Sequence, residues 1–545
     1  MDDHKITTKD TKGTKENTWL ITSWPATIVG ALVLVAALLV VSRQAQPVTP
    51  VSDTAVIESY TAYASRGALL VGPYSRYGWH HPGPIYFYLL APFYMLSGSL
   101  TAGLNAGALA VNLTSMLVLA WVVVRAAHGV LAIVTTAMVA LYAWRIAPIL
   151  VSPWNPHVIV LPTMALIVVC AAILSGWAEL LPLAAAIATF VAQTHLGVLP
   201  SVLVVSAIAL SAVLGAAISE GDPGNRRRLV RIVSITLGVL IVLWALPIWE
   251  QISRTPGNFT KLWQYFAVRD EASQPFRSAY AAWTDMLAGL VRPDLRLAEG
   301  SPFRRSRIPW AEGWAGAQVA LLAMTAFIAG RAGRRFGAAL AALLVFASIT
   351  ALWSATRIQD AIVDHEVFWI SGFGVLGTAV LLDAAMAAGG ERKGRASPRV
   401  TSTLCGLAVC LVAVLGVFQL RRITNETFSP RPQQAAAAAL AEALKQRVPG
   451  VTGAGRPMVR IEQDVWPVAA GVLLNLQKSG VPFAVEDDWL PMFTDAAATT
   501  GRETEVVEIT GRERHFLLTS DGRAVTLAGA GPFYVVLMTP PVQQR

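Results

Sequence analysis

The chain has 545 residues, of which 54% are hydrophobic and only 14% are charged, and its formal net charge is +9. Soluble globular domains carry about 25% Asp, Glu, Lys and Arg, whereas the apolar residues here form runs of roughly 16 to 24, enough to cross a hydrocarbon core of about 30 Å. This pattern excludes a disordered chain, a nucleic-acid-binding protein and a disulfide-stapled secreted domain.

Apolar runs dominate the chain from residue 25 to residue 420. Residues 1–24 are polar and lack the apolar core and cleavage site of a signal peptide, so we predict that they form a cytoplasmic tail. The runs after them predict about 11 to 13 transmembrane helices. The predicted spans are 25–42, 84–98, 102–125, 129–144, 158–175, 178–194, 199–218, 233–249, 314–330, 336–356, 366–387 and 402–420.

Basic residues in short loops predict the orientation, because Lys and Arg are retained on the cytoplasmic side of the membrane. Loops 221–231, 331–335 and 391–399 are rich in arginine and are therefore predicted to be cytoplasmic. The predicted outer segments are 43–83, 145–157, 193–200, 250–313, 357–365 and everything after residue 421.

The run 84–98 does not fit this alternation, because the segments before and after it are both predicted to lie outside. We interpret it as a shallow helix that does not cross the membrane, and the alternative is a missed or extra crossing nearby. Incomplete crossings are tolerated only where they are buried in protein or line a wet cavity. The neighbourhood is therefore a place to expect a site.

Residues 421–545 have the pattern of a small extracytoplasmic α/β domain. Helical periodicity covers 432–447 and 466–480, and strand-like alternation covers the runs between and after them. The predicted strands are 457–462, 482–486, 504–510, 514–519 and 533–538.

The outer loop 43–83 concentrates ionisable and aromatic residues at the membrane surface. Its candidate site residues are Asp53, Glu58, Tyr74, Arg76, His80 and His81. A carboxylate base placed beside an acceptor hydroxyl can activate it for attack on a sugar, and the transition state resembles an oxocarbenium ion. Asp53 is the candidate base, although an Asp here could equally cap a helix that begins at Thr54 or Ala55.

Further candidates lie at the predicted outer ends of spans, where polar groups that face a bundle interior are usually functional. They are Arg145, His157, His195, Arg357, Asp364 and His365. Cations can receive the charge of a phosphate leaving group, although snorkelling toward headgroups also explains arginines at span ends. No residue spacing matches a metal site, so we predict no metal ligands and no required cofactor, and leave a divalent-cation requirement open.

Asp53 directly after the first span and the run HHPGPIYFY from His80 to Tyr88 resemble the GT-C superfamily of polyprenyl-phosphate-sugar-dependent glycosyltransferases. That group includes protein mannosyltransferases and aminoarabinose transferases. The adjacent Asp-Glu pair of the mannosyltransferase branch is absent here, since Glu58 lies five residues after Asp53.

The resemblance implies a multi-pass α-helical GT-C-like fold in the cytoplasmic membrane. It also implies inverting transfer of a hexose or pentose from a polyprenyl-phosphate donor to a glycan, lipid or protein acceptor at the outer face. Asp53 would be the general base, Glu58 a second catalytic residue, and the other candidates would bind substrate. Membrane lipids are expected partners and nucleic acid is not.

Two other functions remain open. A transporter or lipid-glycan flippase would also place polar residues in a helical bundle, but we find no internal repeat with paired broken helices, and the polar residues gather on one face. A non-catalytic scaffold for envelope assembly is the third possibility, and the ionisable first loop argues against it.

Overall fold

The computed structural model describes residues 31, 33–42, 48–127, 130–268, 274–291, 310–390, 418, 432–447, 456–501, 503 and 505–539. The predicted tail 1–24, the basic loop 391–399 and nearly all of the span 402–420 lie outside the described residues.

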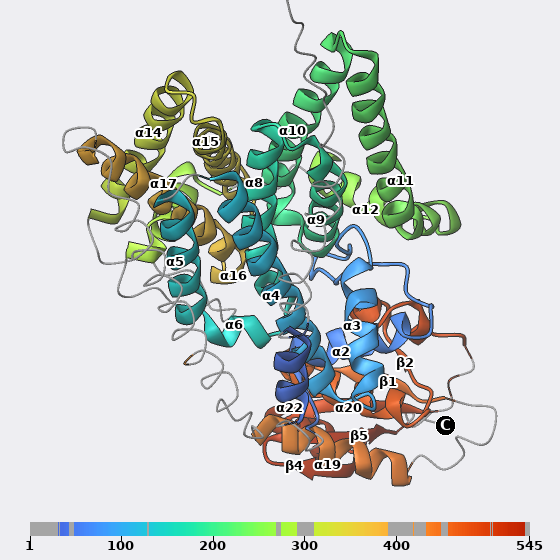
Figure 1. Cartoon of the computed structure of the whole chain (residues 1–545). Coiled ribbons are helices and arrows are strands. Elements are labelled where there is room, and N and C mark those ends of the chain that lie inside the picture. The colour runs from blue at the N-terminus through green and yellow to red at the C-terminus, as the bar shows by residue number, and fades with distance from the viewer. Residues whose placement is uncertain are drawn as a thin grey trace, which may run out of the picture.

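The membrane part is a bundle of helices (Figure 1), and every predicted run from 84 to 387 is helical. Its helices are α2 (Ser52–Ala64), α3 (Ile85–Leu96), α4 (Thr101–Ala126), α5 (Val130–Arg145), α6 (Ala147–Val151), α7 (Asn155–Val158), α8 (Val160–Leu174), α9 (Leu181–Thr194), α10 (Leu199–Ser219), α11 (Pro223–Ser253), α12 (Asn258–Trp263), α13 (Phe276–Leu287), α14 (Trp310–Arg331), α15 (Arg335–Thr356), α16 (Asp364–Val367) and α17 (Ser371–Gly390). Within the described residues, seven helical segments are long and apolar enough to cross a membrane, and four shorter apolar helices match the other described runs. The predicted multi-pass helical fold is confirmed.

Helix α3 explains the break in the predicted alternation. It has 12 residues, which at about 1.5 Å per residue span roughly 18 Å. That is well short of a hydrocarbon core of about 30 Å. Its length therefore supports the shallow helix rather than a missed crossing.

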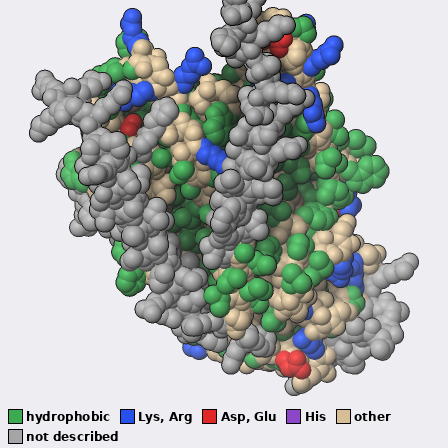
Figure 2. All heavy atoms as spheres, in the orientation of Figure 1, with side chains coloured by type: hydrophobic (Ala, Val, Ile, Leu, Met, Phe, Trp, Pro, Cys, Tyr) green, Lys and Arg blue, Asp and Glu red, His purple; other side chains and the backbone are tan. Residues whose placement is uncertain are grey.

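The predicted basic loop 221–231 is mostly helix, and this corrects the sequence-based assignment. Asp222 accepts a hydrogen bond from the Asn225 amide at 2.7 Å and Pro223 occupies the first turn, so α11 begins ahead of the arginines. Figure 1 shows the α10–α11 and α14–α15 turns at one end of the molecule and the C-terminal sheet at the other. Lysine and arginine side chains gather at the end that carries these turns (Figure 2).

The C-terminal part contains a five-stranded mixed sheet of order β2-β1-β3-β5-β4. Strand β1 is parallel to β2 and β3, and β5 is antiparallel to β3 and β4. The elements are α19 (Pro432–Arg447), β1 (Met458–Ile461), α20 (Trp466–Lys478), β2 (Ala484–Val485), α21 (Leu490–Phe493), β3 (Val506–Gly511), α22 (Arg512–Ser520), β4 (Ala524–Ala530) and β5 (Phe533–Met538). The predicted α/β character is confirmed.

The predicted strand 514–519 is wrong, because these residues belong to α22. Strand β5 occupies the place beside β3, so residues 512–520 cross from β3 to β4 as a helix. As a helix the segment buries Leu518 and leaves Phe516 and Leu517 exposed. Strand β4 was not predicted, because its alanines and glycines resemble a turn.

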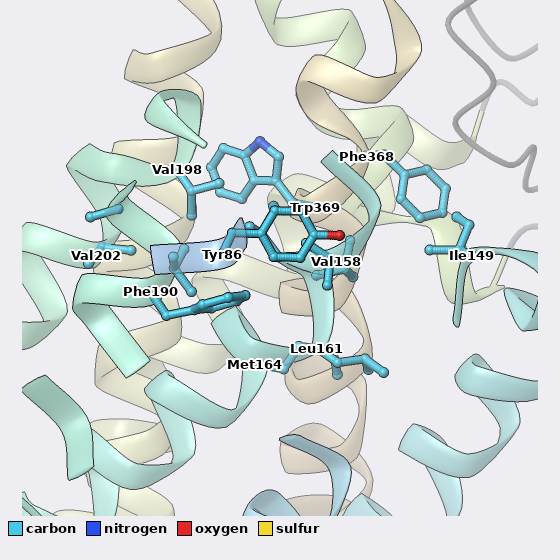
Figure 3. Packing of buried hydrophobic residues seen from close by; sticks show 14 of the residues in the cluster. Tyr86, Ile149, Val158, Leu161, Met164, Phe190, Val198, Val202, Phe368 and Trp369 are labelled. Carbon is cyan, nitrogen blue, oxygen red and sulfur yellow. The ribbon is translucent and has the colours of Figure 1, made fainter. Parts of the chain in front are cut away.

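The core of the bundle lies around α8, whose residues are apolar on every side and almost all buried. A helix that is hydrophobic all round belongs inside a protein. Figure 3 shows Tyr86, Phe190 and Trp369, from three distant parts of the chain, meeting in this core. The Tyr86 hydroxyl donates to the Pro153 carbonyl at 2.5 Å. This packing fixes the short segments that connect the helices on the side of the C-terminal domain.

Candidate functional site

A cavity of about 1540 Å³ lies between these connecting segments and the C-terminal domain. In the membrane part its lining includes residues 52–53, 74–79, 81, 154–156, 195–197, 199–200, 265–266, 351, 353–355, 357–359, 365–367 and 369–370. The domain contributes residues 461, 463, 466, 486–489 and 491–492. Several of these segments are far apart in sequence and were predicted to share the outer face. In the structure these segments line the same cavity.

Asp53 lies on the cavity wall in the first turn of α2. Val51 occupies the N-cap position, so Asp53 is not the helix cap that the sequence also allowed. Its Oδ1 accepts a hydrogen bond from the Tyr74 hydroxyl at 2.6 Å. Burial raises the pKa of the Asp53 carboxyl, against opposing effects of this hydrogen bond and of the nearby His365. A carboxylate with a raised pKa is a stronger base.

Two buried histidines stack on each other in the cavity wall. The rings of His81 and His195 lie 5.2 Å apart with an interplanar angle of 24°. The Leu196 amide donates to His81 Nδ1 at 2.9 Å, and burial together with His195 and His80 holds the pKa of His81 well below 6.5. Neutral His81 therefore carries its proton on Nε2, where it is a hydrogen-bond donor.

Cationic groups line the same cavity. Arg357 ends α15 and is exposed to the cavity, and Arg76 contacts the Tyr77 hydroxyl at 2.7 Å and Asp360 at 3.7 Å. His365 packs against the Trp154 ring, with centroids 4.5 Å apart. The cavity wall thus combines the Asp53 carboxylate, which accepts a hydrogen bond from Tyr74, with imidazole and guanidinium donors.

Five predicted site residues do not line the cavity: Glu58, His80, Arg145, His157 and Asp364. Arg145 donates to the Leu290 carbonyl at 2.9 Å, and His157 bonds Ser152 at 2.7 Å. Asp364 begins α16 and lies 3.8 Å from His365.

Glu58 and His80 instead hold the C-terminal domain. Lys478 of α20 donates to Glu58 Oε1 at 2.6 Å and Thr101 donates to Oε2 at 2.6 Å, and the Glu58 side chain has no exposed surface. His80 Nε2 lies 2.8 Å from the Pro491 carbonyl, which also accepts from Tyr60 at 2.7 Å.

Sequence reasoning missed the contribution of the C-terminal domain to the cavity. Trp466, Trp489 and the acidic run from Glu486 to Asp488 line its wall. A single sequence carries no signal that places residues more than 400 positions apart beside Asp53. Among the described residues, no group of three His, Cys, Asp or Glu side chains could hold a metal ion.

No family model and no curated protein sequence matches the chain. Solved structures do match it. ArnT from Cupriavidus metallidurans bound to undecaprenyl phosphate has a TM-score of 0.50 and 15% identity over 95% of this chain and 99% of ArnT. ArnT in the apo state has a TM-score of 0.53 and 13% identity over 96% and 98%. The chain has an ArnT-like GT-C fold.

The oligosaccharyltransferase AglB from Archaeoglobus fulgidus, in complex with an inhibitory peptide and a dolichol-phosphate, is also similar. Its TM-score is 0.45 and its identity 11%, over 91% of this chain and 70% of AglB. The two ArnT structures confirm the predicted GT-C-like fold, and at these identities they establish the fold alone.

Within the GT-C fold, Gly197 gives the His195 ring its space. A Cβ at residue 197 would lie 3.1 Å from Cε1 and 3.3 Å from Nδ1 of His195. If the cavity is a catalytic site, we expect Gly197→Ala to displace the ring and to lower the turnover of the catalysed reaction roughly ten- to a hundredfold, because small misplacements of active-site groups cost about that much. Turnover of Gly215→Ala is the control, because a Cβ there meets nothing within 4 Å. Equal turnover of both variants would contradict the prediction.

Lowering the pH should reduce the folding stability of the protein through His80, which contacts the C-terminal domain. Burial lowers the pKa of His80 to about 4, whereas an unfolded histidine titrates near 6.5. Between these values the unfolded chain binds more protons than the folded chain, so folding stability falls as the pH falls.

We therefore expect the melting temperature in detergent to drop from pH 6.5 to about 4.5, and to drop less steeply in His80→Gln. His515 is the control, since it lies outside the cavity and bonds Thr526 at 2.8 Å. A pH slope in His80→Gln as steep as in His515→Gln would refute the assignment.

Proposed function

We propose that the protein is an integral-membrane glycosyltransferase. It moves a sugar from a polyprenyl-phosphate donor to an acceptor hydroxyl at the outer face of the cytoplasmic membrane. The observation that carries this proposal is the position of Asp53: a carboxylate with a raised pKa on the wall of a cavity that also presents imidazole and guanidinium groups, within a GT-C fold.

Asp53 acts as the general base of a single displacement. The acceptor oxygen attacks C1 of the sugar, its proton passes to the Asp53 carboxylate, and the bond between C1 and the phosphate oxygen breaks with its electron pair leaving on the phosphate. Tyr74 keeps the carboxylate oriented through its 2.6 Å hydrogen bond. One displacement inverts the configuration at C1.

The departing phosphate is received by groups that need no proton transfer. The Nε2–H of neutral His81 and the guanidinium of Arg357 are suited to it, because preorganised donors stabilise charge as it develops. We assign Glu58 to holding the domain rather than to chemistry, because Lys478 and Thr101 already occupy its oxygens.

The outer location is supported by charge. The arginines at the start of α11 and around the α14–α15 turn lie at the end of the bundle opposite the C-terminal sheet, and arginines next to the ends of spans are retained on the cytoplasmic side. The cavity and the domain would then lie outside, where the lipid-linked donor is presented.

The test uses the full chain in proteoliposomes with radiolabelled polyprenyl-phosphate sugars and an envelope glycan, lipid and protein fraction. Label should leave the carrier lipid for an acceptor while polyprenyl phosphate accumulates, in buffer with and without a chelator. If no donor is consumed but a lipid-linked sugar exchanges across the vesicle membrane, the protein is a flippase and the proposal fails.

A further inference from the structure

The side of the cavity formed by the C-terminal domain carries two free tryptophan faces. Trp466 begins α20, and Trp489 ends a single 3-10 turn that starts at Asp487. Both side chains are half-buried against the core and line the cavity. Within the described chain neither indole makes a hydrogen bond or a ring contact, so a ligand can use both the ring faces and the N–H groups.

This wall is fixed close to Asp53. Helix α20 packs closely against the segment that leads into α2: a Cβ at Gly471 would lie 2.6 Å from the carbonyl oxygen of Pro50, three residues before Asp53. The Pro491 carbonyl, two residues after Trp489, accepts hydrogen bonds from the membrane part. The tryptophans therefore share one rigid cavity with the base.

The charged residues that the C-terminal domain contributes to the cavity lining are all acidic. Glu486 to Asp488 lie beside the tryptophans; Glu486 pairs with Arg460 at 3.0 Å, and Asp487 and Asp488 are exposed without a partner in the described chain. Arg76 and Arg357 belong to the membrane part, which also contributes the carboxylates of Asp53 and Glu366. The donor phosphate is drawn to the arginines, whereas an anionic acceptor would be repelled from the domain wall.

We propose that this wall is the acceptor subsite and that the acceptor is an uncharged glycan. Tryptophan faces stack on sugar rings through their apolar C–H groups, and carboxylates accept hydrogen bonds from sugar hydroxyls. The inference rests on the proposed function, because the hydroxyl to be glycosylated must reach Asp53. It adds the chemical class of the acceptor and the residues that select it.

Equilibrium binding to the full-length Asp53→Asn protein in detergent tests the subsite without turnover. The probes are fluorescently labelled, uncharged hexasaccharides of mannose, arabinose, galactose and glucose, the same glycans bearing a phosphate, and an unrelated hydroxyl-rich peptide. We expect one or more neutral glycans to bind. Trp466→Ala and Trp489→Ala should weaken that binding by at least about tenfold.

The double variant Asp487→Asn/Asp488→Asn separates recognition from folding, since both side chains are exposed. It should reduce the ratio of the affinity for neutral glycans to the affinity for phosphorylated glycans. Glu513→Gln and Asp521→Asn are the controls and should leave this ratio unchanged, because both residues lie outside the cavity. Preferential binding of the phosphorylated glycans or of the peptide, or no binding of any glycan, would overturn the inference. Donor consumption in membranes that still depends on Asp53 would show that the proposed function survives such a result.

Discussion

Replacing Asp53 by asparagine is expected to abolish most sugar transfer while donor binding persists. General base catalysis contributes about 10²- to 10⁴-fold to rates, and an amide of the same shape cannot accept the proton. It can still accept the hydrogen bond from Tyr74, so the cavity should keep its geometry. The measurement is the initial rate of label transfer at saturating donor, together with the affinity for the lipid-linked sugar.

Asp521→Asn is the matched control for that substitution, because Asp521 is exposed at the end of α22 and lies outside the cavity. Tyr74→Phe should have a smaller effect in the same direction, since it leaves the carboxylate in place without its orienting hydroxyl. A normal transfer rate in Asp53→Asn would remove Asp53 from the chemistry, and the proposed mechanism with it.

The second large effect is expected at the Glu58–Lys478 ion pair. Lys478→Met leaves a carboxylate with no exposed surface and no counter-ion, and breaking a buried pair from one side costs about 3–5 kcal/mol. Because the Lys478 side chain is 32% exposed, we expect the lower end of that range. The readout is the melting temperature in detergent, with protease release of the C-terminal domain as a second measurement.

The double variant Glu58→Gln/Lys478→Met should recover much of this stability, because a neutral amide can still accept from Thr101. Lys445→Met is the control, since its pair with Glu442 at 3.8 Å is on the surface and such pairs contribute about 0–1 kcal/mol. If Glu58→Gln instead lost more than a hundredfold in turnover at an unchanged melting temperature, Glu58 would return as a catalytic residue.

The bundle could be predicted from sequence because lipid imposes a strong constraint. Each span must be a long apolar helix, so every predicted run from 84 to 387 is helical, and the shortness of 84–98 already predicted a helix too short for a full crossing. The start of α11 was not predicted, because Asp222 and Pro223 begin the helix within a segment whose arginines are typical of a cytoplasmic loop.

The site was predicted in part. Asp53, Tyr74, His81, His195 and Arg357 belong to segments assigned to the outer face, and the structure places them around one cavity. The same reasoning could not separate these residues from their neighbours. His80 and His81 are adjacent, yet one bonds the C-terminal domain and the other lines the cavity, because successive side chains of an extended segment point in opposite directions.

By itself, the sequence determined that the chain is a polytopic helical protein with an α/β C-terminal part, and it predicted which segments share a membrane face. These properties follow from local hydropathy and from the side on which arginines are retained. Only the tertiary structure decided that Glu58 is sequestered by Lys478 and that Trp466 and Trp489 line the same cavity as Asp53. Contacts between residues more than 400 positions apart depend on how surfaces pack together, and no local pattern in the sequence records them.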